Sequence, residues 1–198
     1  MISAILLTAG LSSRFLSPKA LAGINGSTVI RYLQNKLLES EVAEIIIVLG
    51  AHAPEIKPYI LKHKKVKVVY NKDYILGQTS SFKVGWSVVA SPIQGVLLMP
   101  VDYPAVTVET INLICRSFAL SSPLLLIPTF EGKKGHPPVF HVALREEIMR
   151  LDNSAGLNQI ARQHVRETVY LPVQDPGVRA TFNTPEELGK LKKNLRFI

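Results

Sequence analysis

Short runs of consecutive apolar residues alternate along the chain with stretches in which apolar residues recur every three or four positions. The runs predict strands buried on both faces, and the stretches predict helices with one apolar side. The expected strands are residues 2–7, 45–49, 66–70, 96–99, 124–127 and 168–171, and the expected helices are residues 29–38, a helix from Pro54, 80–90, 108–118, 143–150, 154–164 and 184–195, with a turn and a strand across 129–141. Repeated strand–helix units with short connections favour an α/β fold, a mostly parallel sheet with helices on both faces.

Composition excludes several classes of protein. The 198 residues are 47% hydrophobic and only 19% charged, which excludes an intrinsically disordered chain. The longest apolar runs, residues 45–49 and 96–101, fall far short of the roughly 18 residues of a membrane span. The N-terminal apolar stretch lacks preceding basic residues and does not resemble a signal peptide. One cysteine, Cys115, excludes an internal disulfide, and its place on an apolar helix face predicts a core residue. We therefore expect a cytoplasmic protein.

The chain is basic, with 23 Lys and Arg against 15 Asp and Glu, a formal net charge of +8. Such a balance favours a nucleic acid, an anionic membrane or a phosphorylated small molecule as partner, or reflects a basic surface alone. A nucleic-acid binder is the weakest of these interpretations, because the sequence has neither a recognition motif nor interleaved aromatic residues. The five histidines form no HExxH motif, and no serine lies in GxSxG, which argues against a zinc site and a serine nucleophile.

Ligands in open α/β sheets bind beyond the carboxyl ends of the strands, which directs attention to the loop after the first expected strand. In residues 8–19, small residues allow backbone N–H groups to approach an anion closely. Ser12, Ser13, Arg14 and Lys19 add hydroxyl and cationic donors. The loop contains neither GxxxxGKS/T nor GxGxxG. It is either a phosphate cradle of another kind or an ordinary polar loop with a turn at Gly10.

A single carboxylate follows the fourth expected strand. Asp102 stands in Met99-Pro-Val-Asp-Tyr-Pro104, at the same edge of the expected sheet as the first loop. Magnesium takes one or two carboxylates and completes its shell with water and substrate phosphates. Asp102 is therefore a candidate magnesium ligand, although an aspartate also commonly opens a turn before a proline.

Five segments resemble, in order and spacing, the motifs of the MobA-like nucleotidyltransferases, which are LAAGxSxRMGxxK, NPDYxxGxxxS, GDxP, GHP and DxDTPE/D. The segments are Leu7-Thr-Ala-Gly-Leu-Ser-Ser-Arg14 with Lys19, Asn71-Lys-Asp-Tyr-Ile-Leu-Gly77 with Ser80 and Ser81, Leu98 to Pro104, Gly135 to Phe140, and Thr181 to Glu186. The match runs over essentially the whole chain. It implies a single MobA-like domain over residues 1–198 with a three-layer, Rossmann-like fold and a mostly parallel mixed sheet, similar to nucleotide-diphospho-sugar transferases.

The resemblance implies an enzyme that transfers a nucleoside monophosphate to a phosphorylated acceptor and releases pyrophosphate. The GHP element and the Thr-Ala-Gly start are most similar to the molybdenum cofactor cytidylyltransferase branch. Relatives that use GTP typically carry Leu-Ala-Gly-Gly in the first loop, where this chain has Ala9-Gly10. The resemblance therefore implies CTP, a molybdopterin-type acceptor, magnesium or manganese, and a molybdoenzyme that receives the product.

The resemblance also assigns roles to individual residues. Arg14 and Lys19 hold the leaving phosphates, and Asp102 holds magnesium together with Asn183. The implied nucleotide-binding residues are Leu7, Thr8, Ala9, Gly10, Ser13, Arg14, Lys19, Asn71, Gly77, Ser80 and Asp102. The implied acceptor-binding residues are Gly135, His136 and Pro137. Lys133 and Lys134 beside them suit an anionic acceptor or a solvated turn equally well.

Three departures from the family pattern affect this interpretation. Thr8 and the pair Phe15-Leu16, which replaces Met-Gly, alter the first loop. Leucine disfavours positive φ, so we expect the loop path to differ near Leu16. Asn183 replaces an aspartate, which removes one negative charge but keeps an oxygen that can bind magnesium. Alternatives are therefore another acceptor (a sugar phosphate, a polyol phosphate or phosphocholine), a GTP-using guanylyltransferase, and a non-catalytic carrier of nucleotide or pterin.

Overall fold

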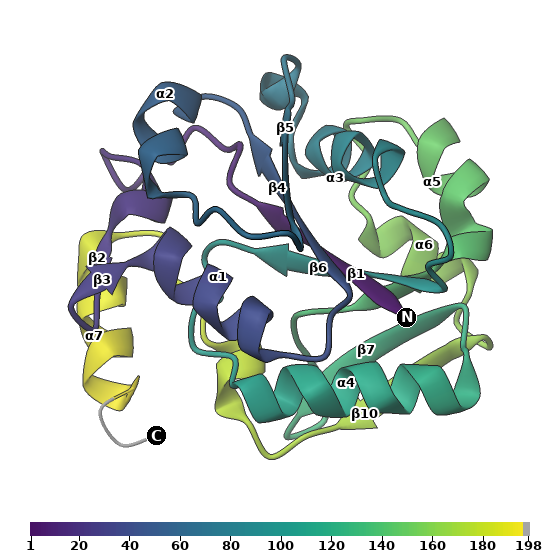
Figure 1. Ribbon diagram of the computed structural model, residues 1–198. Coiled ribbons are helices and arrows are strands. Elements are labelled where there is room, and N and C mark those ends of the chain that lie inside the picture. The colour runs from purple at the N-terminus through teal and green to yellow at the C-terminus, as the bar shows by residue number, and fades with distance from the viewer. Residues whose placement is uncertain (196–198) are drawn as a thin grey trace.

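The computed structural model describes residues 1–195 and shows a central sheet between two layers of helices (Figure 1). The strand order is β10-β7-β9-β6-β1-β4-β5, and β8 pairs with β7. Pairings in the sheet are parallel except those of β9 and β8. The strands are β1 (Ile2–Leu7), β4 (Glu44–Leu49), β5 (Val66–Tyr70), β6 (Gly95–Pro100), β7 (Leu125–Phe130), β8 (Lys133–Lys134), β9 (Val139–His141) and β10 (Thr168–Pro172), and a separate hairpin is formed by β2 (Gly23–Ile24) and β3 (Ser27–Thr28).

The helices divide between the two faces of the sheet, as the alternation of strand side chains requires (Figure 1). In β1, Ala4 and Leu6 belong to the core that packs under α1, α4 and α7, whereas Ile5 and Leu7 belong to the core under α3, α5 and α6. The helices are α1 (Val29–Glu39), α2 (Ala53–Ile56), α3 (Gln78–Ser87), α4 (Val108–Ser121), α5 (Arg145–Arg150), α6 (Asn158–Gln163) and α7 (Pro185–Leu195). The three-layer α/β fold with a mixed, mostly parallel sheet is thus confirmed.

The expected elements are present, with differences at their ends. The helix expected from Pro54 is a single turn, Ala53–Ile56, followed by a 3-10 turn at Lys57–Tyr59. Pro58 lies in that turn, and proline has no N–H with which to continue an α-helix. The helix expected over residues 154–164 begins only at Asn158.

The expectation that Leu16 avoids positive φ is wrong. Leu16 has a φ of 63° and a side chain that is 92% exposed. Its neighbours determine this conformation: Phe15 is buried against the ring of Phe182, with centroids 5.5 Å apart, and the backbone N–H of Lys19 donates to Ser12 Oγ at 3.1 Å. These tertiary contacts hold the loop in a path that costs leucine about 1 kcal/mol.

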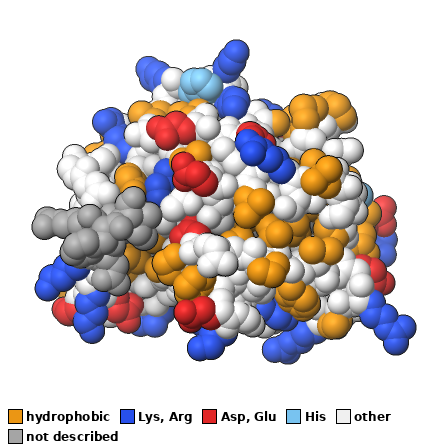
Figure 2. Space-filling view, turned by 90° about the horizontal axis from the view of Figure 1, so that it is seen from below, with side chains coloured by type: hydrophobic (Ala, Val, Ile, Leu, Met, Phe, Trp, Pro, Cys, Tyr) orange, Lys and Arg blue, Asp and Glu red, His pale blue; other side chains and the backbone are white. Residues whose placement is uncertain are grey.

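Three further expectations concern Cys115, membrane-spanning helices and the surface charge. Cys115 is buried, and this burial raises the pKa of its thiol to about 12, which confirms a core residue. Within residues 1–195, no helix has the length and apolar character needed to cross a membrane. On the face shown in Figure 2, Lys and Arg side chains lie mostly around the margin rather than in one patch.

Candidate active site

A cavity of about 330 Å³, here called the nucleotide cavity, lies at the carboxyl ends of β1, β4 and β6. The first loop lines it with residues 7–12 and 18–20, and the loop after β6 lines it with residues 100–102. Its remaining walls are residues His52, Ile56, Tyr74, Ile75, Gly77, Gln78 and Ser81. This is the edge of the sheet at which parallel α/β folds bind ligands.

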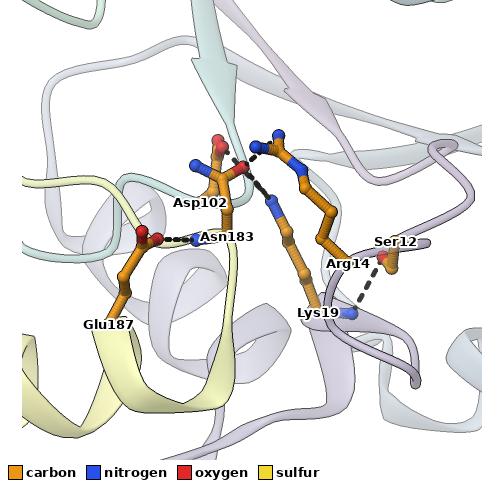
Figure 3. A network of polar contacts seen from close by, with 6 residues as sticks. All are labelled: Ser12, Arg14, Lys19, Asp102, Asn183 and Glu187. Atoms are coloured by element: carbon orange, nitrogen blue, oxygen red, sulfur yellow. Dashed lines mark hydrogen bonds and ion pairs between the residues drawn. The ribbon is translucent and has the colours of Figure 1, made fainter.

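A cluster of four polar side chains stands beside this cavity (Figure 3). Arg14 Nη2 and Lys19 Nζ both donate to Asn183 Oδ1, at 2.8 and 2.9 Å. Lys19 Nζ also lies 3.6 Å from Asp102 Oδ2. Three segments far apart in the sequence therefore bring two cations, one carboxylate and one amide to a single point.

The backbone holds Asn183 next to Asp102. The N–H of Phe182 donates to the carbonyl of Asp102 at 3.3 Å. Glu187, in the first turn of α7, accepts from the N–H of Asn183 at 2.6 Å, and the N–H of Glu187 donates to Thr184 Oγ1 at 3.3 Å. This reciprocal capping satisfies backbone groups at the start of α7 and fixes the segment that carries Asn183.

The loop beyond Asp102 is held from the opposite side by Lys36 of α1. Its Nζ donates to the carbonyls of Pro104 and Val106, at 3.0 and 2.7 Å. Burial lowers the pKa of this amine to about 8, against the opposing effect of nearby carboxylates such as Asp175. Lys36 thus ties the loop that begins at Asp102 to the helix layer.

The first loop is held against the end of β4. The N–H of Ala51 donates to the carbonyl of Ala9 at 3.1 Å. A Cβ at Gly50 would lie only 2.6 Å from that same oxygen and 2.8 Å from Tyr74 Cβ, so the close approach of these segments requires glycine there.

His52 is a residue of the cavity that the sequence motifs did not identify. Its Nε2 lies 3.2 Å from the carbonyl of Leu11, and its Nδ1 lies 3.0 Å from Glu55 Oε1. Burial alone lowers the pKa of His52, but these two acceptors outweigh it and raise the pKa. The signal that could have found His52 is its place directly after the strand next to β1.

Four of the expected nucleotide-binding residues, Ser13, Arg14, Asn71 and Ser80, lie outside the cavity lining. Asn71 is buried, and its Nδ2 donates to the hydroxyls of Ser80 and Ser81, both at 2.9 Å. Ser80 Oγ in turn donates to backbone carbonyls of Asp73 and Gly77. Asn71 and Ser80 therefore shape the turn that places Gly77 and Gln78 in the cavity wall.

A second cavity of about 580 Å³, here called the acceptor cavity, adjoins the first, and Gln78 lines both. Its lining is apolar from β6, β7, β9 and α6, and polar at Tyr103, Lys134, His136, Asn158 and Arg162. The lining contains two cations and no Asp or Glu. Of the expected acceptor residues, Gly135 and His136 line this cavity, whereas Pro137 does not.

His136 is held rigidly in the wall of the acceptor cavity. Its backbone N–H donates to the backbone carbonyl of Val178 at 2.8 Å, and its ring packs against the ring of Tyr103 with centroids 4.5 Å apart. Burial lowers the pKa of His136, against the opposing charge of Asp102. Its Nδ1 is buried and finds no hydrogen-bond partner among residues 1–195. One polar atom of this wall residue is therefore left without a partner in the described part of the chain.

The donor set near the nucleotide cavity fits a hard divalent cation that is only partly held by protein. Asp102 offers carboxylate oxygens and Asn183 an amide oxygen, and both face the same Lys19 amine. Among residues 1–195, no three His, Cys, Asp or Glu side chains gather into a metal site. Magnesium and manganese with few protein ligands rely on phosphates and water for the rest of their shell.

Residues 4–169 match the family model of the MobA-like NTP transferase domain. The chain belongs to this family. A nicotine blue oxidoreductase of Paenarthrobacter nicotinovorans is 26% identical over 209 residues, with 96% of each chain covered. A probable molybdenum cofactor guanylyltransferase of Bacillus mycoides is 26% identical over 199 residues, again with 96% of each chain covered. The family assignment makes the protein a nucleotidyltransferase.

Solved structures share the fold. The protein Rv0371c of Mycobacterium tuberculosis H37Rv has a TM-score of 0.85 at 22% identity, with 97% of each chain covered. The same protein has been solved in complex with manganese, with a TM-score of 0.80, 22% identity, and coverage of 97% of this chain and 98% of that one. A nucleotidyl transferase of Methanothermobacter has a TM-score of 0.84 at 21% identity, and covers 100% of this chain and 98% of its own.

Proposed function

We propose that this protein transfers CMP from CTP to the phosphate of a molybdopterin-type acceptor, with release of pyrophosphate. The observation that carries the proposal is the cluster of Arg14, Lys19, Asp102 and Asn183 beside the nucleotide cavity, which adjoins the acceptor cavity at Gln78. The first cavity lies at the first loop, and the second is lined by two cations and no carboxylate, so a nucleotide and an anionic acceptor bind next to each other.

The reaction requires little covalent participation by the protein. An acceptor phosphate oxygen forms a bond to the α-phosphorus while the bond to the β-phosphate breaks, and catalysis consists of positioning and charge neutralisation. Arg14 and Lys19 bind the leaving β- and γ-phosphates in place of their contacts with Asn183. Backbone N–H groups of the first loop approach the nucleotide. Asp102 and Asn183 would hold magnesium, which neutralises charge on the phosphates.

The acceptor cavity supports an acceptor that is both apolar and anionic. Leu98, Leu125, Ile127 and Phe140 form an apolar wall, which a flat ring system covers better than a hydrated sugar does. Lys134 and Arg162 at its rim suit a phosphate. His136, packed beside Tyr103, contributes to the wall of this cavity. A molybdopterin-type molecule combines these properties. We further propose a molybdoenzyme as the recipient of the product.

The choice of CTP rests on the first loop, where Ala9-Gly10 replaces the Gly-Gly of relatives that use GTP. The curated relative from Bacillus mycoides carries the name of a guanylyltransferase, so GTP is the competing substrate. Pyrophosphate release is measured with magnesium and purified molybdenum cofactor, in parallel with CTP and with GTP. We expect release with CTP. Release with GTP alone would retain the enzyme class and reverse the choice of base.

A matched series of acceptors tests the other half of the proposal. A sugar phosphate, a polyol phosphate and phosphocholine are each offered with both nucleotides. Turnover of one of these in preference to the pterin would reassign the acceptor. Nucleotide binding without pyrophosphate release from any acceptor would indicate a carrier rather than an enzyme.

A further inference from the structure

The cluster beside the nucleotide cavity carries no net negative charge. Arg14 and Lys19 contribute two positive charges, Asp102 and the adjacent Glu187 contribute two negative charges, and Asn183 contributes none, so the charges cancel. Asp102 is also the one carboxylate among the residues that line this cavity. A divalent cation that approaches the free protein therefore meets a site with no net charge to attract it.

In the free protein, oxygen atoms of both candidate cation ligands, Asn183 and Asp102, already contact positively charged side chains. Asn183 Oδ1 accepts two hydrogen bonds, from Arg14 at 2.8 Å and from Lys19 at 2.9 Å. Lys19 Nζ also lies 3.6 Å from the Asp102 carboxylate. Neither Arg14 nor Lys19 forms an ion pair with any other carboxylate of residues 1–195, so nothing else in this part of the chain draws them away from these oxygens.

A nucleoside triphosphate reverses both conditions. Its phosphates bring several negative charges, and phosphates are the preferred partners of arginine and lysine. Contacts of Arg14 and Lys19 with the phosphates release Asn183 Oδ1 and the Asp102 carboxylate. The same phosphates supply further oxygen ligands, which suits a cation with few protein ligands.

We propose that the triphosphate completes the divalent-cation site, and that the missing negative charge at Asn183 keeps the free protein from holding the cation. Metal and nucleotide then bind together, and each raises the affinity for the other by the same factor. The inference deepens the proposed function, because it rests on binding of a nucleoside triphosphate, but it is independent of the base and of the acceptor.

The test compares manganese binding to the free wild-type protein with binding to two variants, by electron paramagnetic resonance of unbound Mn²⁺. Asn183→Asp restores the negative charge, and Asn183→Ala removes the oxygen without adding charge. We expect Asn183→Asp to bind one Mn²⁺ at least about tenfold more tightly than the wild type, because ligand charge sets cation affinity. Wild type and Asn183→Ala are expected to bind equally weakly. Equal binding by wild type and Asn183→Asp would overturn the proposal.

A second measurement follows the coupling itself. Calorimetry with α,β-methylene-CTP and its GTP counterpart, which cannot be cleaved at the reacting bond, gives nucleotide affinity with and without Mn²⁺. We expect a larger metal-dependent gain in the wild type than in Asn183→Asp, and thermal unfolding checks that both are folded. A gain of equal size in the two proteins contradicts the inference. Failure of both analogues to bind would instead overturn the proposed function, while the Mn²⁺ titrations of free protein still decide the role of Asn183.

Discussion

The two cavities that meet at Gln78 are built in different ways. The nucleotide cavity is lined mainly by loops and turns at the ends of parallel strands, with the first loop close to Gly50. The acceptor cavity is lined by residues within β6, β7, antiparallel β9 and α6 and by the loops beside them. Backbone donors recognise phosphate, which every nucleotide carries, whereas side chains recognise the one molecule that they fit. On the proposed function, one half of the site therefore serves the reaction and the other selects the acceptor.

The largest effect is expected at the polar cluster beside the nucleotide cavity. Asp102→Asn keeps the shape of the side chain and removes the negative charge beside Lys19. We expect kcat/KM to fall by about 10³-fold, the range seen when a preorganised electrostatic contact to the reacting group is removed. Steady-state pyrophosphate release measures this loss. Unchanged turnover would remove Asp102 from the proposed metal site and from catalysis.

The nucleotide half is expected to be sensitive to backbone crowding. Gly50→Ala places a Cβ 2.6 Å from the Ala9 carbonyl and 2.7 Å from Ala9 Cβ, so the first loop must move. We expect a loss of about 1–3 kcal/mol in unfolding free energy and a higher KM for the nucleotide. Gly23→Ala, an exposed position outside the cavity lining where a new Cβ meets nothing within 4 Å, is the matched control. Equal effects of the two substitutions would refute the close-approach argument.

The acceptor half is expected to respond through KM for one substrate only. Arg162 lines the acceptor cavity and not the nucleotide cavity. Because a charged hydrogen bond contributes about 1.5–3 kcal/mol, Arg162→Ala is expected to raise the acceptor KM by about tenfold or more. The nucleotide KM should stay the same. Arg166→Ala, an exposed change outside the lining of either cavity, serves as control. An equal rise in both KM values would contradict the assignment of the two cavities to two different substrates.

The smallest effect is a pH dependence in the nucleotide half. The pKa of His52 is raised above its ordinary value of 6.5 by its contacts with Glu55 and Leu11, so its contribution to stability is fully present below that value. The contribution is lost as pH rises through the higher folded-state pKa. We expect the stability difference between wild type and His52→Ala to stay below about 1 kcal/mol and to be larger near about pH 5 than near about pH 8.5. Chemical denaturation at both pH values measures this stability difference. The opposite trend would contradict a stabilising contact between His52 and the carbonyl of Leu11.

Local patterns were sufficient for much of the fold and for part of the site. Buried strands such as β1 and β4 appear as uninterrupted apolar runs, because both of their faces pack against helices. Lys19 and Asp102 follow strand ends, and parallel strands carry their ends to one edge, so their proximity was predictable. The helix predicted from Pro54 has a single turn, because Pro58 lies directly beyond it and has no N–H to continue the α-helical hydrogen bonds.

Other features depended on contacts between distant segments. Leu16 takes a left-handed conformation against its own preference because Phe15 and Lys19 are anchored on either side of it. His52 carries no motif, and its role follows from the carbonyl of Leu11, 41 residues away. Arg162 enters the acceptor cavity only because α6 packs on the sheet beside β7 and β9.

The layers of this protein, the edge of the sheet that carries the site and the types of residue available there all follow from the sequence. They depend on periodicity and on strand direction, which are local properties of the chain. Folding was needed to bring Asn183 within hydrogen-bond distance of both Arg14 and Lys19, 169 and 164 residues away, and to line the acceptor cavity with two cations and no carboxylate. Charge balance at a point depends on every segment that reaches it, and that sum exists only in the folded chain.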